Sequence, residues 1–261
     1  MREKQTPLKK YFFDNEKNLI NKWDHYFDIY ERHFKKYKGR DIVLLEIGVS
    51  HGGSLQMWSD YFGDNAQIYA IDNDPRCKEF EKNNIKIFIG SQSDKNFLVQ
   101  VKDNIPKVDI LIDDGGHFMS QQIISFEVLF DHIQDDGVYL CEDTHTSYWL
   151  QFGGGYKRNG TFIEYSKNLI DTLNAYHSEE KRFKVDYYTK SINSIHYYDS
   201  IFVIEKKNRS EPKNVISGKI SFNNSLVSNY KPNIKPFHKN KILMYLNKIL
   251  RALRLKSFIW R

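Results

Sequence analysis

The sequence alternates short apolar runs with stretches of helical periodicity, and each run ends in a glycine or an acidic residue. Strand-like runs that alternate with helices are typical of an open parallel sheet covered on both faces. Ligands bind such a sheet at the carboxyl ends of its strands, where these glycines and acids fall. The runs are residues 42–47, 67–71, 85–89, 108–112 and 138–141, and the helices expected between them are residues 54–61, 75–83, 94–104 and 120–134.

Further helices and strands are expected on both sides of this alternating segment. Apolar residues at three- and four-residue intervals predict one helix over residues 13–38. The glycine- and aromatic-rich residues 144–160 are long for a strand-to-helix connection and are interpreted as a lid. A helix over residues 162–176 and two strands over 184–188 and 200–205, close enough in sequence to pair as a hairpin, follow.

Charge is distributed unevenly along the 261 residues. The net charge is +6, but residues 206–261 hold fourteen Lys/Arg and one acid, whereas the first 205 residues hold 25 Lys/Arg and 32 Asp/Glu. Such an acidic body offers no groove for nucleic acid, so no nucleic-acid partner is expected. Two cysteines, Cys77 and Cys141, are too few for a disulfide framework, and residues 1–10 lack the apolar segment of a signal peptide. We therefore expect a cytoplasmic protein.

The end of the chain has a helical period of its own. A linker over residues 206–238 precedes a basic amphipathic helix over 239–261, with its helical period over 239–256. Such a helix binds an anionic membrane surface, which would place the protein peripherally on the inner face of the membrane, or it packs on the body or on a second subunit of a homo-oligomer. Both readings stay open. The apolar stripe is Ile242, Leu243, Tyr245, Leu246, Ile249, Leu250 and Leu253, the basic residues are Lys241, Lys248, Arg251 and Arg254, and Trp260 follows.

A glycine-containing loop follows the first expected strand. Gly48 and Gly52 lie between Glu46 in that strand and a helix that starts near Ser54. Glycine lets the backbone approach a ligand, and a helix N-terminus offers free N–H groups, so the loop is a candidate cofactor site. Its spacing is neither that of a dinucleotide fingerprint nor that of a P-loop. A tight turn that merely needs glycine is the alternative.

Asp72 ends the second expected strand, 24 residues after Gly48. A carboxylate in this place accepts hydrogen bonds from the ribose hydroxyls of a bound nucleoside. The alternative is a solvated acid in a turn in which Asp74 caps the next helix. The loop and Asp72 together favour nucleoside binding without separating NAD from S-adenosylmethionine.

Two acidic pairs, Asp113-Asp114 and Glu142-Asp143, close two successive strands. Four converging carboxylates repel one another unless positive charge lies between them. Oxygen ligands without thiolates suit Mg²⁺, Mn²⁺ or Ca²⁺ rather than structural zinc. Helix capping or binding to loop amides is the alternative for these acids.

A histidine follows each acidic pair. His117 lies on a glycine turn three residues after Asp114 and is the candidate general base, with His145 as its rival. A third histidine, His51 in the glycine loop, is expected to pack near the cofactor rather than to do chemistry.

Three stretches carry a family resemblance: residues 44–58 (LLEIGVSHGGSLQMW), 112–117 (IDDGGH) and 139–149 (YLCEDTHTSYW). They resemble the metal-dependent sugar O-methyltransferases of macrolide biosynthesis, of the mycinamicin and macrocin (tylosin) deoxysugar type. The resemblance runs from about Trp23 to about Tyr156, with a weaker match to Glu205. It implies an α/β, Rossmann-like class I methyltransferase fold, with a mostly parallel seven-stranded sheet and helices on both faces. A helical cap over residues 1–40 and a methyltransferase domain over residues 41–205 follow from it.

The resemblance also implies roles for individual residues. The metal ligands fall on Asp114, Glu142 and Asp143, and the base falls on His117. Ser91 stands where the family has an acid, which leaves Gln92 as the expected adenine contact. Tyr148 and Trp149 are expected to contact the substrate. The residues expected to bind the cofactor are Glu46, Gly48, Gly52, Ser54, Asp72, Gln92, Asp113, His25 and Tyr26.

The function expected from the sequence is transfer of a methyl group from S-adenosylmethionine to a sugar hydroxyl, with Mg²⁺ or Mn²⁺ as the metal. A composition low in Ala and Gly and rich in Lys, Asn and Ile, together with the basic tail, points to a glycan precursor of polysaccharide biosynthesis as the acceptor. A nicotinamide-dependent oxidoreductase and a catalytically inert glycan-binding module are the alternatives. The sequence specifies neither the sugar nor the hydroxyl.

Overall fold

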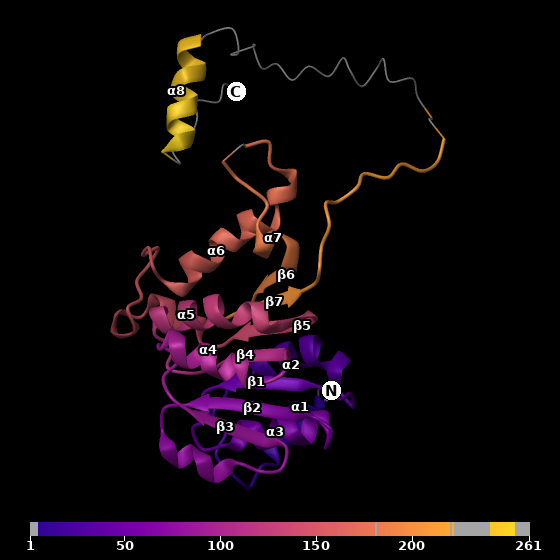
Figure 1. Cartoon of the computed structure of the whole chain (residues 1–261), viewed down its shortest axis with the longest axis vertical. Helices are drawn as coiled ribbons and strands as arrows, with labels where there is room; N and C mark the ends of the chain where they lie inside the picture. The colour runs from indigo at the N-terminus through magenta and orange to yellow at the C-terminus, as the bar shows by residue number, and fades with distance from the viewer. Residues whose placement is uncertain (1–4, 181, 220, 222–240, 254–261) are drawn as a thin grey trace. The chain divides into compact units, whose positions relative to one another are not determined.

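The computed structural model describes residues 5–180, 182–219, 221 and 241–253, in two compact units divided after Pro212. The first unit holds the sheet, and the second holds the helix α8 (Lys241–Ala252) (Figure 1). Of the expected linker, residues 207–219 and 221 are described and contain neither helix nor strand. Arg254 and Trp260 of the expected C-terminal helix lie outside the described residues.

Seven strands form one sheet in the order β3-β2-β1-β4-β5-β7-β6. Strands β1 to β5 pair in parallel, whereas β7 is antiparallel to both of its neighbours, β5 and β6. This arrangement confirms the expected mostly parallel, seven-stranded α/β sheet. The strands are β1 (Val43–Ile47), β2 (Gln67–Asp72), β3 (Ile85–Ile89), β4 (Val108–Asp113), β5 (Ile133–Cys141), β6 (Ile192–Tyr197) and β7 (Phe202–Lys206).

Helices cover both faces of the sheet, and each face has an apolar core of its own (Figure 1). Consecutive residues of a strand point to opposite faces, so Leu44 of β1 belongs to one core and Leu45 to the other. The first core includes residues of α1 (Pro7–Phe13), α2 (Tyr26–Phe34) and α3 (Gly53–Phe62). The second includes residues of α4 (Lys95–Asp103), α5 (Met119–Leu129) and α6 (Phe162–Leu173).

The single helix expected over residues 13–38 is wrong. The chain forms α1, a non-helical stretch over residues 14–25, then α2 and the 3₁₀ helix η1 (Lys35–Tyr37). Ile20 is buried in the core although it lies outside any helix. The apolar residues of this stretch are therefore buried through contacts with the rest of the fold and not as one face of a helix. The stretch lies along a cavity.

The strand expected over residues 184–188 is also wrong. Asp186 accepts a hydrogen bond from the Thr189 N–H, and this N-cap starts α7 (Tyr187–Ser191), so the strand begins only at Ile192. The expected hairpin exists, but β6 rather than residues 184–188 pairs with β7.

The remaining differences are smaller. The helix expected over residues 75–83 is the 3₁₀ helix η2 (Pro75–Phe80), and the expected lid contains η4 (Thr144–Tyr148) and η5 (Leu150–Phe152). The 3₁₀ helix η3 (Phe130–His132) follows α5, and η6 (Ala175–His177) follows α6. None of the described helices combines the length and apolar character needed to cross a bilayer.

Candidate active site

A cavity of about 400 Å³ opens at the carboxyl ends of the central strands. Segments far apart in the sequence line it: the non-helical N-terminal stretch, the loop after β1, the ends of β2 and β3, the turn after β4, and Asp143 after β5. A concave site of this size at the edge where parallel strands end is the usual place for a cofactor in an open α/β sheet. Of the expected site residues, the lining includes Gly48, Ser54, Asp72, Gln92, Asp114, His117 and Asp143.

The ends of β1 and β4 touch at Gly48, which has a φ of +97°. A Cβ atom at this position would lie 2.0 Å from the Asp114 carbonyl oxygen. Only glycine therefore allows the first loop to pass so close to the acidic turn. Gly52, in the left-handed region at φ +71°, precedes the first turn of α3 but does not line the cavity.

Asp72 holds the glycine loop in shape. Its Oδ2 accepts hydrogen bonds from the N–H groups of Val49 (2.8 Å) and Ser50 (3.1 Å), and its Oδ1 accepts one from Asp74 (2.9 Å). Asp74 itself caps η2, as the alternative interpretation of this turn expected. Asp72 lines the cavity and keeps acceptor capacity, because each carboxylate oxygen has two lone pairs.

Two expected cofactor residues lie beneath the cavity rather than in its lining. Glu46 is buried and accepts hydrogen bonds from Ser54 Oγ (3.0 Å) and Trp58 Nε1 (3.1 Å). Burial raises the pKa of Glu46 to about 7. Asp113 is buried as well, and burial raises its pKa to about 6, against the hydrogen bond that Gln92 donates to it. Both carboxyl groups therefore hold neighbouring side chains in place beneath the cavity.

Gln92 lines the cavity, but its amide group is already engaged in the protein. Nε2 donates to Asp113 Oδ1 and Ser125 Oγ, both at 3.1 Å. Oε1 accepts the N–H of Gly116 at 2.7 Å. Gln92 thus ties the end of β3 to the turn after β4.

Three of the four acids converge, since Asp113 is turned to Gln92, and a lysine lies between the carboxylates of Asp114 and Glu142. The Lys22 ammonium forms ion pairs with Asp114 and with Glu142 (2.9 Å), and the lysine side chain is 3% exposed. Burial alone would lower the pKa of Lys22, but the charges of Asp114, Glu142 and Glu46 raise it above its ordinary value. The positive charge that four carboxylates require is therefore supplied in part by the chain itself.

Two tyrosines of α2 hold the second acidic pair. Tyr30 Oη donates to Glu142 Oε1, and Tyr26 Oη donates to Asp143 Oδ1, each at 2.7 Å. Burial first, and then the charge of Asp114, raise the pKa of Glu142 to about 8. Tyr26 was expected to bind the cofactor, whereas the structure places its hydroxyl on a carboxylate.

His117 lies beside Asp114 and Asp143, whose side chains are partly exposed. Its Nε2 is 3.5 Å from Asp143 Oδ2 and 3.9 Å from Asp114 Oδ1. Its Nδ1 is buried without a hydrogen-bond partner among the described residues. His117 and Asp143 both have positive φ, 57° and 52°, a backbone conformation that is uncommon outside glycine and frequent at functional sites.

Asp114, His117 and Asp143 each place one ligand atom within 4.8 Å of the others. This donor set of two carboxylates and one imidazole can hold a divalent cation. Glu142, the third ligand that the family resemblance implies, is outside this group and bonded to Lys22 and Tyr30.

His145 and Tyr148 line a second cavity, of about 440 Å³, next to β6 and α6. His145 Nδ1 bonds with Ser200 Oγ and lies 3.8 Å from Asp143 Oδ1. The Trp149 ring packs edge-on against His145 at 4.6 Å. The two candidate bases therefore lie in different cavities, on either side of Asp143.

Two other histidines lie away from the first cavity's lining. His25 Nε2 contacts the Asp199 carbonyl oxygen at 3.0 Å, and the side chain of His51 in the glycine loop is exposed. Lys22 and Tyr30 are the residues that sequence reasoning missed. The repulsion expected among four carboxylates was a signal for a buried cation, but periodicity assigned both residues to one long helix.

Comparison with known proteins agrees with this arrangement. Residues 45–144, from β1 to the second acidic pair, match the family described as a methyltransferase domain. The solved structure of MycE methyltransferase from the mycinamycin biosynthetic pathway, in complex with Mg and SAH, has a TM-score of 0.68 and 30% identity to this chain. It is matched over 77% of this chain and 54% of its own. The chain has the class I methyltransferase fold.

Sugar O-methyltransferases are among the homologues of this methyltransferase domain. Mycinamicin VI 2''-O-methyltransferase of Micromonospora griseorubida is 33% identical over 195 residues, which are 70% of this chain and 48% of the relative. Demethylmacrocin O-methyltransferase of Streptomyces fradiae is 32% identical over 207 residues, 74% of this chain and 52% of the relative. The chain thus spans about half the length of the curated relatives it matches.

Proposed function

We propose that this chain is an S-adenosylmethionine-dependent O-methyltransferase that methylates a sugar hydroxyl with the help of Mg²⁺ or Mn²⁺. One observation carries the proposal: the glycine loop with Asp72 and the cluster of Asp114, His117 and Asp143 line the same cavity. A nucleoside cofactor and a chelated hydroxyl could therefore meet there. The MycE structures, which are complexes with Mg and SAH and, in one case, also with mycinamycin VI, support this assignment.

The cofactor would occupy the half of the cavity formed by the loop after β1. Asp72 would accept hydrogen bonds from the ribose hydroxyls, and the first turn of α3 with Ser54 would face the polar end of the cofactor. Gly90, Ser91 and Gln92 line the same cavity and would border the adenine.

Asp114 and Asp143 would hold the divalent ion, with Glu142 as a third carboxylate that the metal shares with Lys22. When bound, the metal would lower the pKa of the acceptor hydroxyl, and S-adenosylmethionine would supply the methyl group. His117 would accept the hydroxyl proton, and Asp143, 3.5 Å from Nε2, would stabilise the imidazolium that results. Tyr26 and Tyr30 would hold Asp143 and Glu142 in place through their hydroxyl groups.

The acceptor is proposed to be a glycan precursor made in the cytoplasm, in keeping with the rhamnosyl groups in the names of two relatives that act on tetracenomycin C derivatives. Tyr148 and Trp149, which are 52% and 46% exposed, would contact it next to the second cavity. The test is transfer of labelled methyl groups from S-adenosylmethionine to nucleotide-linked and lipid-linked sugars, with and without EDTA. Full activity after exhaustive chelation would exclude the metal.

The base is tested by comparing two histidines. His117→Ala is expected to lower turnover by roughly 10²–10⁴-fold while affinity for S-adenosylhomocysteine is kept, because the base acts on the proton and not on the cofactor. His145→Ala, on the other side of Asp143, serves as the matched variant. If His145→Ala shows the larger loss of turnover, the assignment of the base is reversed.

Two alternative activities predict different outcomes. A nicotinamide oxidoreductase would bind NAD, and an inert glycan-binding module would bind sugar without transfer. Cofactor titration followed by mass spectrometry of the incubated sugar separates both from a methyltransferase.

A further inference from the structure

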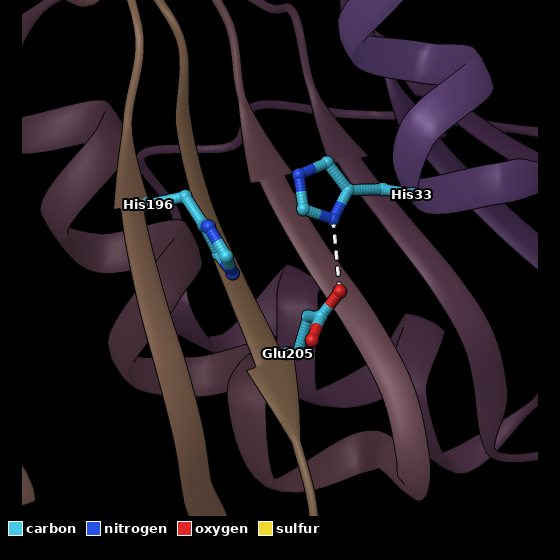
Figure 2. A group of neighbouring side chains, drawn as sticks. All are labelled: His33, His196 and Glu205. Atoms are coloured by element: carbon cyan, nitrogen blue, oxygen red, sulfur yellow. Dashed lines mark hydrogen bonds and ion pairs between the residues drawn. The ribbon is translucent and has the colours of Figure 1, made fainter.

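Three side chains of the kind that bind transition metals converge away from the proposed active site. They are His33 of α2, His196 of β6 and Glu205 of β7, and one ligand atom of each lies within 4.8 Å of the others. Figure 2 shows His33 reaching from its helix toward the two strands, with its imidazole facing the Glu205 carboxylate. Residues so far apart in sequence meet here only because the fold brings α2 against the hairpin.

The sheet register explains the strand half of the cluster. Glu205 lies directly opposite Ser194, and His196 comes two residues later on the same face of β6. The histidine of the helix is buried, with 1% of its side chain exposed, whereas 33% of the Glu205 side chain is exposed. His33 is therefore held in place beneath α2, whereas the cluster is open to solvent at Glu205.

The hydrogen bonds orient these side chains as they are oriented in metal sites. His33 Nδ1 is 3.0 Å from Glu205 Oε1, and its Nε2 is 2.9 Å from Tyr198 Oη. A metal ion that replaced the proton between Nδ1 and the carboxylate would leave Nε2–H to donate to Tyr198. Metal-binding histidines almost always have such a second partner, which fixes the ring and its tautomer.

Ser194 orients the other two side chains in a similar way. Its Oγ donates to Glu205 Oε2 at 3.1 Å and lies 3.0 Å from His196 Nε2. If His196 Nε2–H donates to this hydroxyl, its Nδ1 keeps a free lone pair. The donor set of two imidazoles and one carboxylate is that of zinc sites with an open fourth position, and Mg²⁺ and Ca²⁺ prefer oxygen alone.

One of the three distances between ligand atoms already suits a bound ion. Tetrahedral bonds of about 2.0–2.2 Å place neighbouring ligand atoms about 3.3 Å apart, close to the 3.0 Å between His33 and Glu205. His196 is the ligand that would have to approach. It is partly exposed and lies on β6, the last strand in the sheet order.

The geometry points to a site for a late first-row divalent ion, of the Zn²⁺ or Co²⁺ type, formed by His33, His196 and Glu205. The ion would fasten α2 to the β6–β7 hairpin. The same helix carries Tyr26 and Tyr30, whose hydroxyls hold two of the active-site carboxylates. Occupancy of the site would thus stiffen the element that supports the acidic cluster, whatever reaction that cluster performs.

The test uses the full chain, stripped of metal and free of any affinity tag, titrated with Co²⁺ in the presence of excess Mg²⁺. Wild type is expected to bind one equivalent of Co²⁺ with the visible absorption of a four-coordinate nitrogen-ligated ion. His196→Ala and Glu205→Gln should weaken binding at least tenfold, and Ser194→Ala about 10- to 100-fold through the lost orienting bond. His196 is chosen over the buried His33 because its replacement on an exposed edge leaves the core intact.

Two controls locate the signal. His177→Ala removes an exposed histidine outside the cluster and should leave Co²⁺ binding unchanged. Asp114→Asn with Asp143→Asn removes the proposed catalytic ligands and should leave it unchanged as well. The site is refuted if wild type binds no Co²⁺, or if His196→Ala binds it with the affinity and spectrum of wild type.

Discussion

At the scale of single residues, the carboxylates of this protein divide into those that shape the cavity and those that face it. Asp72 does both, because it holds two loop amides and lines the cavity. Glu46 and Asp113 only shape it from below. Their positions at the ends of the expected strands predicted where all three would gather, but not which would be buried, since burial depends on the helices that cover them.

Asp72→Asn is expected to weaken S-adenosylhomocysteine binding. The amide has one acceptor oxygen in place of two, so either the N–H groups of Val49 and Ser50 or the N–H of Asp74 lose their acceptor and the loop is displaced. A lost partner of this kind costs about 1–3 kcal/mol, or roughly 5- to 150-fold in affinity. Calorimetry measures the change. Asp74→Asn is the matched control, because Asn caps a helix as well as Asp does and residue 74 does not line the cavity. Equal affinity in the two variants would remove Asp72 from the cofactor site.

Lys22→Met is expected to destabilise the protein strongly in metal-free buffer. It leaves Asp114 and the buried Glu142 without their counter-ion, a loss that typically costs about 3–5 kcal/mol. Mn²⁺ should restore part of this stability, because a divalent ion at the same carboxylates replaces the missing charge. Urea unfolding with and without Mn²⁺ measures both effects.

The control for that experiment is Lys102→Met. Lys102 pairs with the half-exposed Asp131, so its loss should cost less than about 1 kcal/mol and should not respond to Mn²⁺. If Lys22→Met is no more damaging than Lys102→Met, Lys22 is not the counter-ion of the acidic cluster.

At the scale of elements, the sequence predicted four of the five parallel strands closely, because each is a compact apolar run with a turn signal behind it. The fifth, β5, begins five residues before the strand expected over residues 138–141. The errors lie where local pattern and tertiary position disagree. Ile20 and Trp23 have helical spacing, yet they lie in a non-helical stretch whose Lys22 pairs with the acidic cluster. Residues 184–188 looked strand-like, but the Asp186 cap starts a helix there.

The first helix, α1, should contribute measurably to stability although the sequence did not predict it. Leu8 is fully buried in the core shared with α2 and α3. Leu8→Ala should therefore lower the free energy of unfolding by about 2–5 kcal/mol. Phe13→Ala, at the other end of the helix and 57% exposed, should cost about 1 kcal/mol or less. Similar values for both in urea unfolding would show that α1 is not docked through Leu8.

At the scale of the whole molecule, an acidic unit with the proposed active site and a basic C-terminal unit share one chain. The domain limits expected from the sequence remain a proposal, with the methyltransferase domain over residues 41–205. The two compact units divide after Pro212, within the expected linker. In α8 the side chains of Ile242 and Tyr245 are more than 60% exposed, unlike the buried apolar side chains of α2 and α3.

We expect α8 to bind anionic membrane surfaces. Lys241 and Lys248 lie in the described helix, and each basic residue near such a surface contributes about 1 kcal/mol, so the full chain should sediment with phosphatidylserine vesicles and less so as salt rises. Leu246→Glu with Ile249→Glu should abolish sedimentation because charge replaces the apolar face. Lys36→Gln, a lysine of the first unit, is the control and should not change it.

A protein ending at His238 should remain folded and active but stay in the supernatant, because the sheet and every proposed catalytic residue lie before that point. If the full chain ignores the vesicles, or if the shortened protein is insoluble, α8 packs on protein instead.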